Sequence, residues 1–346
     1  MTPAARSSGT PPRGEGLRVA IVGAASLRGK EVKQALEERL FPVKKLALLD
    51  DDEALGQLTQ FQGEPAIVAS IDLDVFRDND LVFFASTASA FTLGQWPQAA
   101  AGTAAVIDLS HALLEVSEAR VRVPALADCL PPPEESPRRW YIVPHAASIA
   151  LLALLGRLSR AFPLRQAVAN VFEPVSERGA AGLDELQEQT VRLLSFQEFP
   201  RAVYDAQVAF NLLARYGAQS SAYLEDVAEI VRAGVERCAP ALAGRLALRV
   251  LQAPVFHAHV LSVFVELEQP AEVAAVEQAL AGRRVAVLKQ GELPAGAVDV
   301  AGRDEVIVGP VVRDPRRPEC FWLWAVADNL RLTAHTAVDI AETLLN

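Results

Sequence analysis

Cysteine is scarce in this sequence, and its spacing fits neither a redox pair nor a zinc site. Only Cys129, Cys238 and Cys320 occur among 346 residues. They form no Cys-x-x-Cys pair and no set at zinc-ligand spacing, so no metal site is predicted. A number this low and odd is typical of proteins that work in a reducing, intracellular compartment.

Long apolar runs and basic runs are missing as well. No stretch approaches the roughly 18 uninterrupted apolar residues of a membrane span, so no membrane partner is expected. The first residues lack the apolar core of a signal peptide, and their Pro, Gly, Ser and Thr predict a disordered arm over residues 1–15. The net charge is −10 and Lys and Arg do not cluster, so no nucleic acid partner is expected. These absences favour a cytoplasmic protein.

What is present indicates an α/β protein of two domains. Half of the residues (51%) are hydrophobic, as in a globular protein with a buried core. At about 150 residues per domain, a chain of 346 residues is expected to form two domains. Over residues 16–145, buried strands with an intervening helix predict a Rossmann-type dinucleotide-binding domain with a parallel sheet. Its strands are expected at 17–22, 46–49, 81–84, 104–107 and 141–143, and its first helix at 30–40.

The second half has a different pattern. Over residues 146–327, strands and long helices predict an α+β domain with a mixed sheet. The last segment, residues 328–346, is expected to be a helix that packs back on the first domain. The strands are expected at 168–172, 248–251, 260–267 and 306–308, and the helices at 149–158, 182–194, 223–238, 270–281 and 328–345.

The turn after the first strand carries a candidate cofactor site. Gly23 and Gly29 would let backbone N–H groups approach a pyrophosphate at a helix N-terminus, with Ser26, Leu27 and Arg28 between them. Equally, the glycines could merely permit a tight strand-to-helix turn, and Arg28 could be a solvated surface residue.

The end of the second strand is strongly acidic. Residues 50–53 read Asp-Asp-Asp-Glu, and a carboxylate there accepts hydrogen bonds from the ribose hydroxyls of NAD but repels the 2′-phosphate of NADP. If a cofactor binds, NAD is therefore favoured over NADP, with Asp51 as a contact. The alternatives are a solvated acidic turn and no cofactor at all.

Five short runs are informative together. They are GAASLRG at 23–29, EERLFPV at 37–43, VIDLS at 106–110, PVFHAH at 254–259, and DNLR at 328–331 with AVDIAE at 337–342. In the same order they resemble GATGAVG, LEERNFPV, VIDNSS, PVFxGH and DNLRKGAALNAVQIAE of the aspartate-semialdehyde dehydrogenases. The resemblance extends from about residue 16 to the C-terminus, and on it the chain is identified as a member of that family.

The resemblance implies a known chemistry. Members interconvert aspartyl-β-phosphate and aspartate semialdehyde with NADP(H), as part of amino-acid biosynthesis, and they form homodimers through the second domain. A cysteine at a helix N-terminus forms a thioester with the substrate, a histidine acts as acid and base, and a glutamine orients the substrate. Two arginines hold the substrate carboxylate and the phosphate.

This sequence departs from that pattern at the nucleophile. The family's NPNCST run matches residues 143–148, VPHAAS, and places Ala146 at the cysteine. A methyl group cannot form a thioester, and no cysteine lies nearby in the sequence. Ser148 is a poor replacement, and we expect it to cap the following helix. No role is assigned to His145.

The positions that contact the substrate in the family also differ in this sequence. Glu173 stands at the orienting glutamine, Gln252 at one substrate arginine and Leu114 at the other, so both cationic contacts are replaced. The NADP-favouring Ser and Arg match Asp51 and Glu53. His259 keeps the place of the catalytic histidine, although a lone histidine is more often structural. Asn329 keeps the place of the residue that meets the nicotinamide, or it caps the last helix.

Three hypotheses about function follow. The first is a non-catalytic, dimeric paralogue that acts by binding a protein or a small ligand. The second is an active NAD-linked oxidoreductase of altered chemistry, with His259 and Glu173 as acid and base. The third is a structural partner that forms mixed dimers with an active dehydrogenase. The missing nucleophile favours the non-catalytic readings.

Overall fold

The computed structural model describes residues 16–51, 54–72, 74–86 and 104–345. The expected disordered arm (1–15) and Glu53 of the acidic run lie outside these residues. The chain forms two compact units, one of residues 1–120, 134–143 and 337–346, and the other of residues 121–133 and 144–336. Among the residues described, no helix combines the length and hydropathy needed to cross a bilayer.

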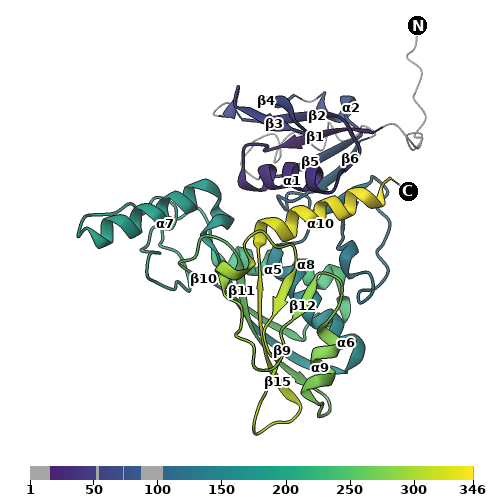
Figure 1. Cartoon of the computed structure of the whole chain (residues 1–346), viewed down its shortest axis with the longest axis vertical. Helices are drawn as coiled ribbons and strands as arrows, with labels where there is room; N and C mark the ends of the chain where they lie inside the picture. Colours follow the sequence, from purple (N-terminus) through teal and green to yellow (C-terminus); the bar gives the residue numbers. More distant parts are fainter. Residues whose placement is uncertain (1–15, 52–53, 73, 87–103, 346) are drawn as a thin grey trace. The chain divides into compact units, whose positions relative to one another are not determined.

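The first unit is built on a mostly parallel sheet of order β3-β4-β2-β1-β5-β6-β8-β7 (Figure 1). Its central strands are mostly apolar and buried, as expected of parallel strands covered on both faces. The elements are β1 (Leu17–Val22), α1 (Leu27–Glu38), β2 (Val43–Asp50), β3 (Leu58–Phe61), β4 (Glu64–Ser70), α2 (Val75–Asp78), β5 (Leu81–Phe84), β6 (Ala105–Asp108), β7 (Arg120–Val121) and β8 (Trp140–Ile142).

The second unit contains a mixed sheet of order β10-β9-β11-β15-β13-β12, with β14 paired to β15. Its strands are β9 (Leu164–Glu173), β10 (Leu246–Gln252), β11 (His259–Leu267), β12 (Val285–Val287), β13 (Val306–Val308), β14 (Val312–Arg313) and β15 (Cys320–Ala327). Along β9, buried Ala167, Ala169 and Val171 alternate with more exposed residues, so one face of the sheet covers the core.

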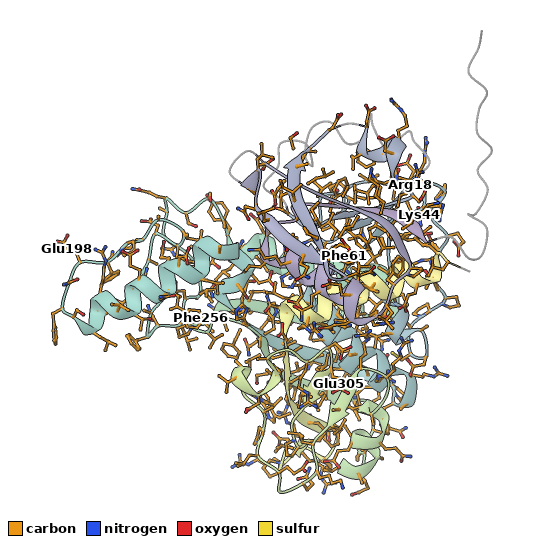
Figure 2. All side chains as sticks on the ribbon, turned by 45° about the horizontal axis from the view of Figure 1, so that its top comes forward. Arg18, Lys44, Phe61, Glu198, Phe256 and Glu305 are labelled. Atoms are coloured by element: carbon orange, nitrogen blue, oxygen red, sulfur yellow. The ribbon has the colours of Figure 1, made fainter. Side chains whose placement is uncertain are left out.

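Helices and short helical turns complete the second unit. A continuous helix consists of α5 (Ala146–Leu151), a π-helical segment (Leu152–Gly156) and α6 (Arg157–Ala161). Helix α7 extends away from the sheet of this unit, and Glu198 lies near the far end of the projection (Figures 1 and 2). The other elements are η2 (Pro124–Leu126), η4 (Val175–Arg178), α7 (Gly179–Leu194), α8 (Leu224–Cys238), η5 (Pro240–Leu242), α9 (Val273–Leu280), η6 (Ala297–Val300) and α10 (Asn329–Thr343).

Helix α10 contributes to both units. Its first residues belong to the second unit, whereas residues 337–346 belong to the first. Within the first unit, Arg39 at the end of α1 forms an ion pair with buried Asp339 at 3.1 Å. A charged contact therefore links the C-terminal part of α10 to the end of α1.

Some elements differ from the sequence expectation. Helix α1 begins three residues earlier than expected, because Ser26 Oγ accepts a hydrogen bond from the Gly29 N–H at 3.0 Å and caps the helix. Helix α5 begins at Ala146 and not at residue 149. Strand β15 and the β3–β4 hairpin were not expected, and the hairpin turns at Gln62 and Gly63, both with positive φ.

Candidate functional site

The glycines of the first turn are needed by the packing itself. Gly23 has φ of 81°, and a Cβ on it would lie 2.5 Å from the Cβ of Ser86. A Cβ on Gly29 would lie 2.2 Å from the carbonyl oxygen of Gly23. This close approach between the turn and helix α1 is the contact that dinucleotide-binding domains also require. Helix α1 begins at Leu27, so the Leu27 and Arg28 N–H groups belong to its first turn.

The acidic end of β2 is tied to the same turn. Asp50 Oδ2 accepts a hydrogen bond from the Ala25 N–H at 2.7 Å, and Asp50 Oδ1 accepts one from the Asp51 N–H at 2.9 Å. Asp51 itself is exposed. The first unit thus brings the turn residues and the acidic strand end together, with Asp50 as a structural member and Asp51 facing solvent.

In the second unit, three buried side chains converge from separate elements. His145 precedes α5, Glu173 ends β9 and His259 begins β11. One ligand-type atom from each side chain lies within 4.8 Å of the others. The rings of His145 and His259 are 5.0 Å apart between centroids, in an edge-to-face arrangement. We refer to these three residues as the His–Glu–His cluster.

The carboxylate of this cluster is held by an arginine. Glu173 Oε1 accepts a hydrogen bond from Arg178 at 2.9 Å, and Glu173 is fully buried. Burial raises the pKa of Glu173, Arg178 opposes that rise, and Glu177 adds to it. His145 Nε2 lies 3.6 Å from Glu177 Oε2. The site therefore brings two carboxylates, one guanidinium and two imidazoles close together in space.

Gln252, at the place of a substrate arginine, is engaged in a neutral network. Its Oε1 accepts a hydrogen bond from the hydroxyl of Tyr216 at 2.7 Å, and its Nε2 donates to the carbonyl of Glu173 at 2.8 Å. Arg178 lies over the ring of Tyr216, 5.5 Å from its centroid. Gln252 is fully buried and itself carries no charge, and the nearby positive charge of Arg178 is already paired with Glu173.

Asn329 does not cap the last helix. Asp328 does, because its Oδ1 accepts hydrogen bonds from the N–H groups of Leu330 and Arg331, each at 3.1 Å. The Asn329 Nδ2 donates to Glu177 Oε1 at 2.9 Å, and its Oδ1 accepts from the Ala258 N–H at 3.1 Å.

Ala258 directly precedes His259 and has φ of 75°. This left-handed backbone conformation is unfavourable for any residue but glycine. The loop that leads to it exposes Phe256, labelled in Figure 2, which is 46% exposed.

The expectation that Ser148 caps a helix is wrong. His145 is the cap, since its Nδ1 accepts a hydrogen bond from the Ala147 N–H at 3.2 Å. Ser148 lies inside α5, and its hydroxyl donates to the carbonyl of Val231 at 2.9 Å. Sequence reasoning missed this because the cap position is held by a histidine, which is not among the usual capping residues.

None of the three cysteines is an activated thiol. Burial raises the pKa of Cys129 to about 11 and that of Cys238 to about 12, and it also raises the pKa of Cys320. Cys320 begins β15, and the opposite end of that strand, Ala327, pairs with His259. An eight-residue strand separates the two ends by roughly 23 Å.

The structure places the expected site residues in two groups. Gly23, Ser26, Leu27, Arg28 and Asp51 are in the first unit, as is half-buried Leu114 in the loop after β6. The second unit holds the expected residues Ala146, Glu173, Gln252, His259 and Asn329. It also holds Glu177 and Arg178, which the sequence did not single out, and His145, whose role the sequence left open. A signal for Glu177 and Arg178 exists, since they stand at the Gly and Ala of the family's TYQAVSGAG run.

Comparison with known protein families gives two matches that together span most of the chain. Residues 18–129 match the NAD-binding domain of semialdehyde dehydrogenases, and residues 155–332 match the semialdehyde dehydrogenase dimerisation domain. The expected fold class, a Rossmann-type domain followed by a dimerisation domain with a mixed sheet, is confirmed.

Individual relatives cover nearly the full length. A USG-1 protein homologue of Pseudomonas aeruginosa is 32% identical over 95% of this chain and 98% of its own. The aspartate-semialdehyde dehydrogenase of Prochlorococcus marinus is 27% identical over 95% of this chain and 96% of its own. A solved structure of a probable aspartate-semialdehyde dehydrogenase from Pseudomonas aeruginosa is 32% identical, with a TM-score of 0.85 over 96% of this chain and 99% of that chain. The chain therefore belongs to the aspartate-semialdehyde dehydrogenase family.

Proposed function

We propose that this chain is a non-catalytic, dimeric member of its family that no longer interconverts aspartyl phosphate and aspartate semialdehyde. The observation that carries the proposal is Ala146. It is the first residue of α5 and 1% exposed, at the place that the NPNCST-like run gives to the nucleophile. Covalent catalysis needs a thiolate at that place, and a methyl group has no lone pair with which to attack a carbonyl.

No other cysteine supplies the missing group. The raised pKa values of Cys129, Cys238 and Cys320 keep their thiols protonated near neutral pH. Only the thiolate is an effective nucleophile. Cys320 is in addition at the far end of β15 from the strand end that pairs with His259.

The substrate contacts support the same conclusion. Gln252 is buried and uncharged, and Leu114 has no charge, so neither can bind a carboxylate or phosphate as arginine does. Loss of a nucleophile costs on the order of 10⁴- to 10⁶-fold in rate. Loss of each arginine–substrate charge pair costs roughly a further 2–5 kcal/mol of binding free energy. The combined losses place the family reaction outside a useful rate.

Cofactor binding is a separate property of the first unit. We propose that this unit binds NAD in preference to NADP, because the Asp50 carboxylate and exposed Asp51 put negative charge beside the turn before α1. We also propose that the chain forms a homodimer in the cytoplasm. As a homodimer it would act by binding a protein or a small ligand. The alternative is that its subunit pairs with that of an active dehydrogenase in a mixed dimer.

One observation supports a second candidate function, an NAD-linked oxidoreductase of altered chemistry. Glu173 and His259 are both fully buried, lie close together, and include a carboxyl group of raised pKa. Pairs of this kind perform acid and base catalysis in other enzymes. This candidate needs no thioester and would therefore tolerate Ala146.

A single assay separates the candidates. The purified protein is incubated with aspartate semialdehyde, phosphate and either NADP or NAD, beside an active dehydrogenase of the family, and the reduced cofactor is followed by absorbance. We expect no turnover above background. Turnover within about a hundredfold of the active enzyme would contradict the proposal. NAD reduction without phosphate, abolished in His259→Asn, would favour the second candidate.

A further inference from the structure

We propose that the His–Glu–His cluster of the second unit binds a divalent transition-metal ion, with zinc as the expected occupant. Two of the three ligands, His145 and Glu173, stand at an asparagine and a glutamine of the family motifs. The site is thus a feature of this chain's own residues. It does not depend on whether the family reaction has been lost.

The ligand types and their spacing fit such an ion. Imidazole nitrogens bind zinc at about 2.0–2.1 Å and carboxylate oxygens at about 2.0–2.2 Å, which places ligand atoms around one ion roughly 3–4 Å apart. In this structure the three ligand atoms lie within 4.8 Å of one another. Side-chain movements of about an ångström would therefore bring His145, Glu173 and His259 into the coordination distance.

Burial adds a reason for a cation. Glu173 and His259 are 0% exposed and His145 is 5% exposed. A buried carboxylate is costly unless positive charge lies near it. Arg178 binds only Oε1 of Glu173, and Oε2 accepts no hydrogen bond from the described residues. An ion at the cluster would use this second oxygen.

The neighbouring charges suit a divalent cation. Glu173 and Glu177 bring two negative charges and Arg178 brings one positive charge, so these three residues are together negative. Glu177 is itself held by Asn329 at 2.9 Å. A carboxylate that accepts the second N–H of a ligating histidine is the usual outer partner in zinc sites, and Glu177 lies 3.6 Å from His145 Nε2.

The neighbours of His145 favour Nδ1 as its ligating atom. If Nε2–H donates to Glu177, Nδ1 is the nitrogen that binds the ion, and it gives up its 3.2 Å hydrogen bond with the Ala147 N–H. That exchange is the local cost of metal binding. Two imidazoles and one carboxylate are a frequent ligand set for zinc, and they leave a further coordination position for water.

The test is a titration of the metal-stripped full-length protein with Zn²⁺ alone, followed by calorimetry, and with Co²⁺, followed by its visible absorption. We expect one ion per chain. Glu173→Gln and His145→Asn preserve side-chain shape approximately, and each should weaken Zn²⁺ affinity by at least about tenfold. The matched control is His257→Asn, which removes a half-buried histidine two residues from His259 and should leave the affinity unchanged.

Two results would overturn the inference. One is a wild-type protein that binds less than one equivalent of Zn²⁺, a result that does not depend on the folding of any variant. The other is wild-type affinity in both cluster variants, provided that their melting temperatures show them to be folded. The titration contains neither cofactor nor substrate, so its failure would leave the proposed loss of the dehydrogenase reaction untouched.

Discussion

At the scale of single residues, Ala146 and its neighbours determine what the site can do. We expect Ala146→Cys alone to leave dehydrogenase turnover at background. The new thiol would stand at the helix N-terminus, but Glu173, Gln252 and Leu114 would still provide none of the substrate contacts that the family uses. The measurement is the coupled assay with NADP or NAD. Turnover within about a hundredfold of an active family member would show that the arginines are dispensable.

The residues of the candidate site could be predicted only in part. The motif runs singled out Ala146, Glu173 and His259, and the structure has all three in the second unit. They did not reveal that His145 caps α5 or that Arg178 binds Glu173. These contacts span only two and five residues, but they depend on the backbone path of the turns after β8 and β9, which the sequence alone does not specify.

At the scale of elements, an ion pair joins two neighbouring strands of the first unit. Arg18 of β1, labelled in Figure 2, donates to Asp80 beside β5 at 2.7 Å from its guanidinium and at 2.9 Å from its backbone N–H. The hydrogen bond from the Arg18 side chain is the main reason that the pKa of Asp80 is lowered from its ordinary value of 3.8. The pair is about one-third exposed, which limits its contribution to stability.

We expect Asp80→Asn to lower the free energy of unfolding at pH 7 by about 0.5–1 kcal/mol. Because the pKa of folded Asp80 is lowered, its stabilising effect is present above the ordinary carboxyl pKa and is lost as the pH falls through the folded value. The difference between wild type and variant should therefore shrink as the pH drops below 3.8. Urea denaturation of both proteins at several pH values measures this difference in the free energy of unfolding. A difference that stays constant with pH would contradict the proposed ion pair.

Elements were predictable where a local pattern determines them. The strands Leu17–Val22, Leu81–Phe84 and Val306–Val308 were expected at these bounds, because each is an apolar run next to a turn or a polar residue. Strand β15 is also apolar, but its buried residues do not alternate strictly, and such a run does not distinguish a strand from a buried helix. The β3–β4 hairpin is largely exposed and so lacks a hydrophobic signal.

At the scale of the whole molecule, one row of apolar side chains crosses the outer face of the second sheet. Val168, Phe264, Trp322 and Val312 are paired in register across β9, β11, β15 and β14. Three of them are exposed, Val168 at 41%, Trp322 at 44% and Val312 at 56%. The row lies within the residues that match the dimerisation domain, and an exposed apolar surface of this kind is typical of a protein interface.

We expect Trp322→Glu to weaken the homodimer, because it places a charge on this row without altering the buried face of β15. Sedimentation velocity over a range of protein concentrations gives the dissociation constant. Leu293→Glu, at a loop residue that is 88% exposed and outside the row, serves as the control and should remain dimeric. A Trp322→Glu protein that dimerises as tightly as the control would place the interface elsewhere.

Long-range order is the part that the sequence could not supply. The strand orders of the two sheets, and the pairing of β11 with both β9 and β15, join segments that are far apart in the chain. The same arrangement assembles the His–Glu–His cluster from three separate elements. No metal site was predicted from the sequence because neither histidine lies at ligand spacing from the other or from Glu173.

The turn at Ala258 places a strained backbone conformation directly before His259. In the family run PVFxGH this residue is glycine, yet here an alanine keeps φ of 75°, at a cost of roughly 1–2 kcal/mol. Several contacts hold this shape: the Ala258 N–H donates to Asn329 Oδ1 at 3.1 Å, and the N–H groups of Val175 and Ser176 donate to the carbonyls of Val255 and Phe256. His259 is itself paired with Ala327 in the sheet, so the strained residue is followed directly by a side chain that the sheet keeps in place.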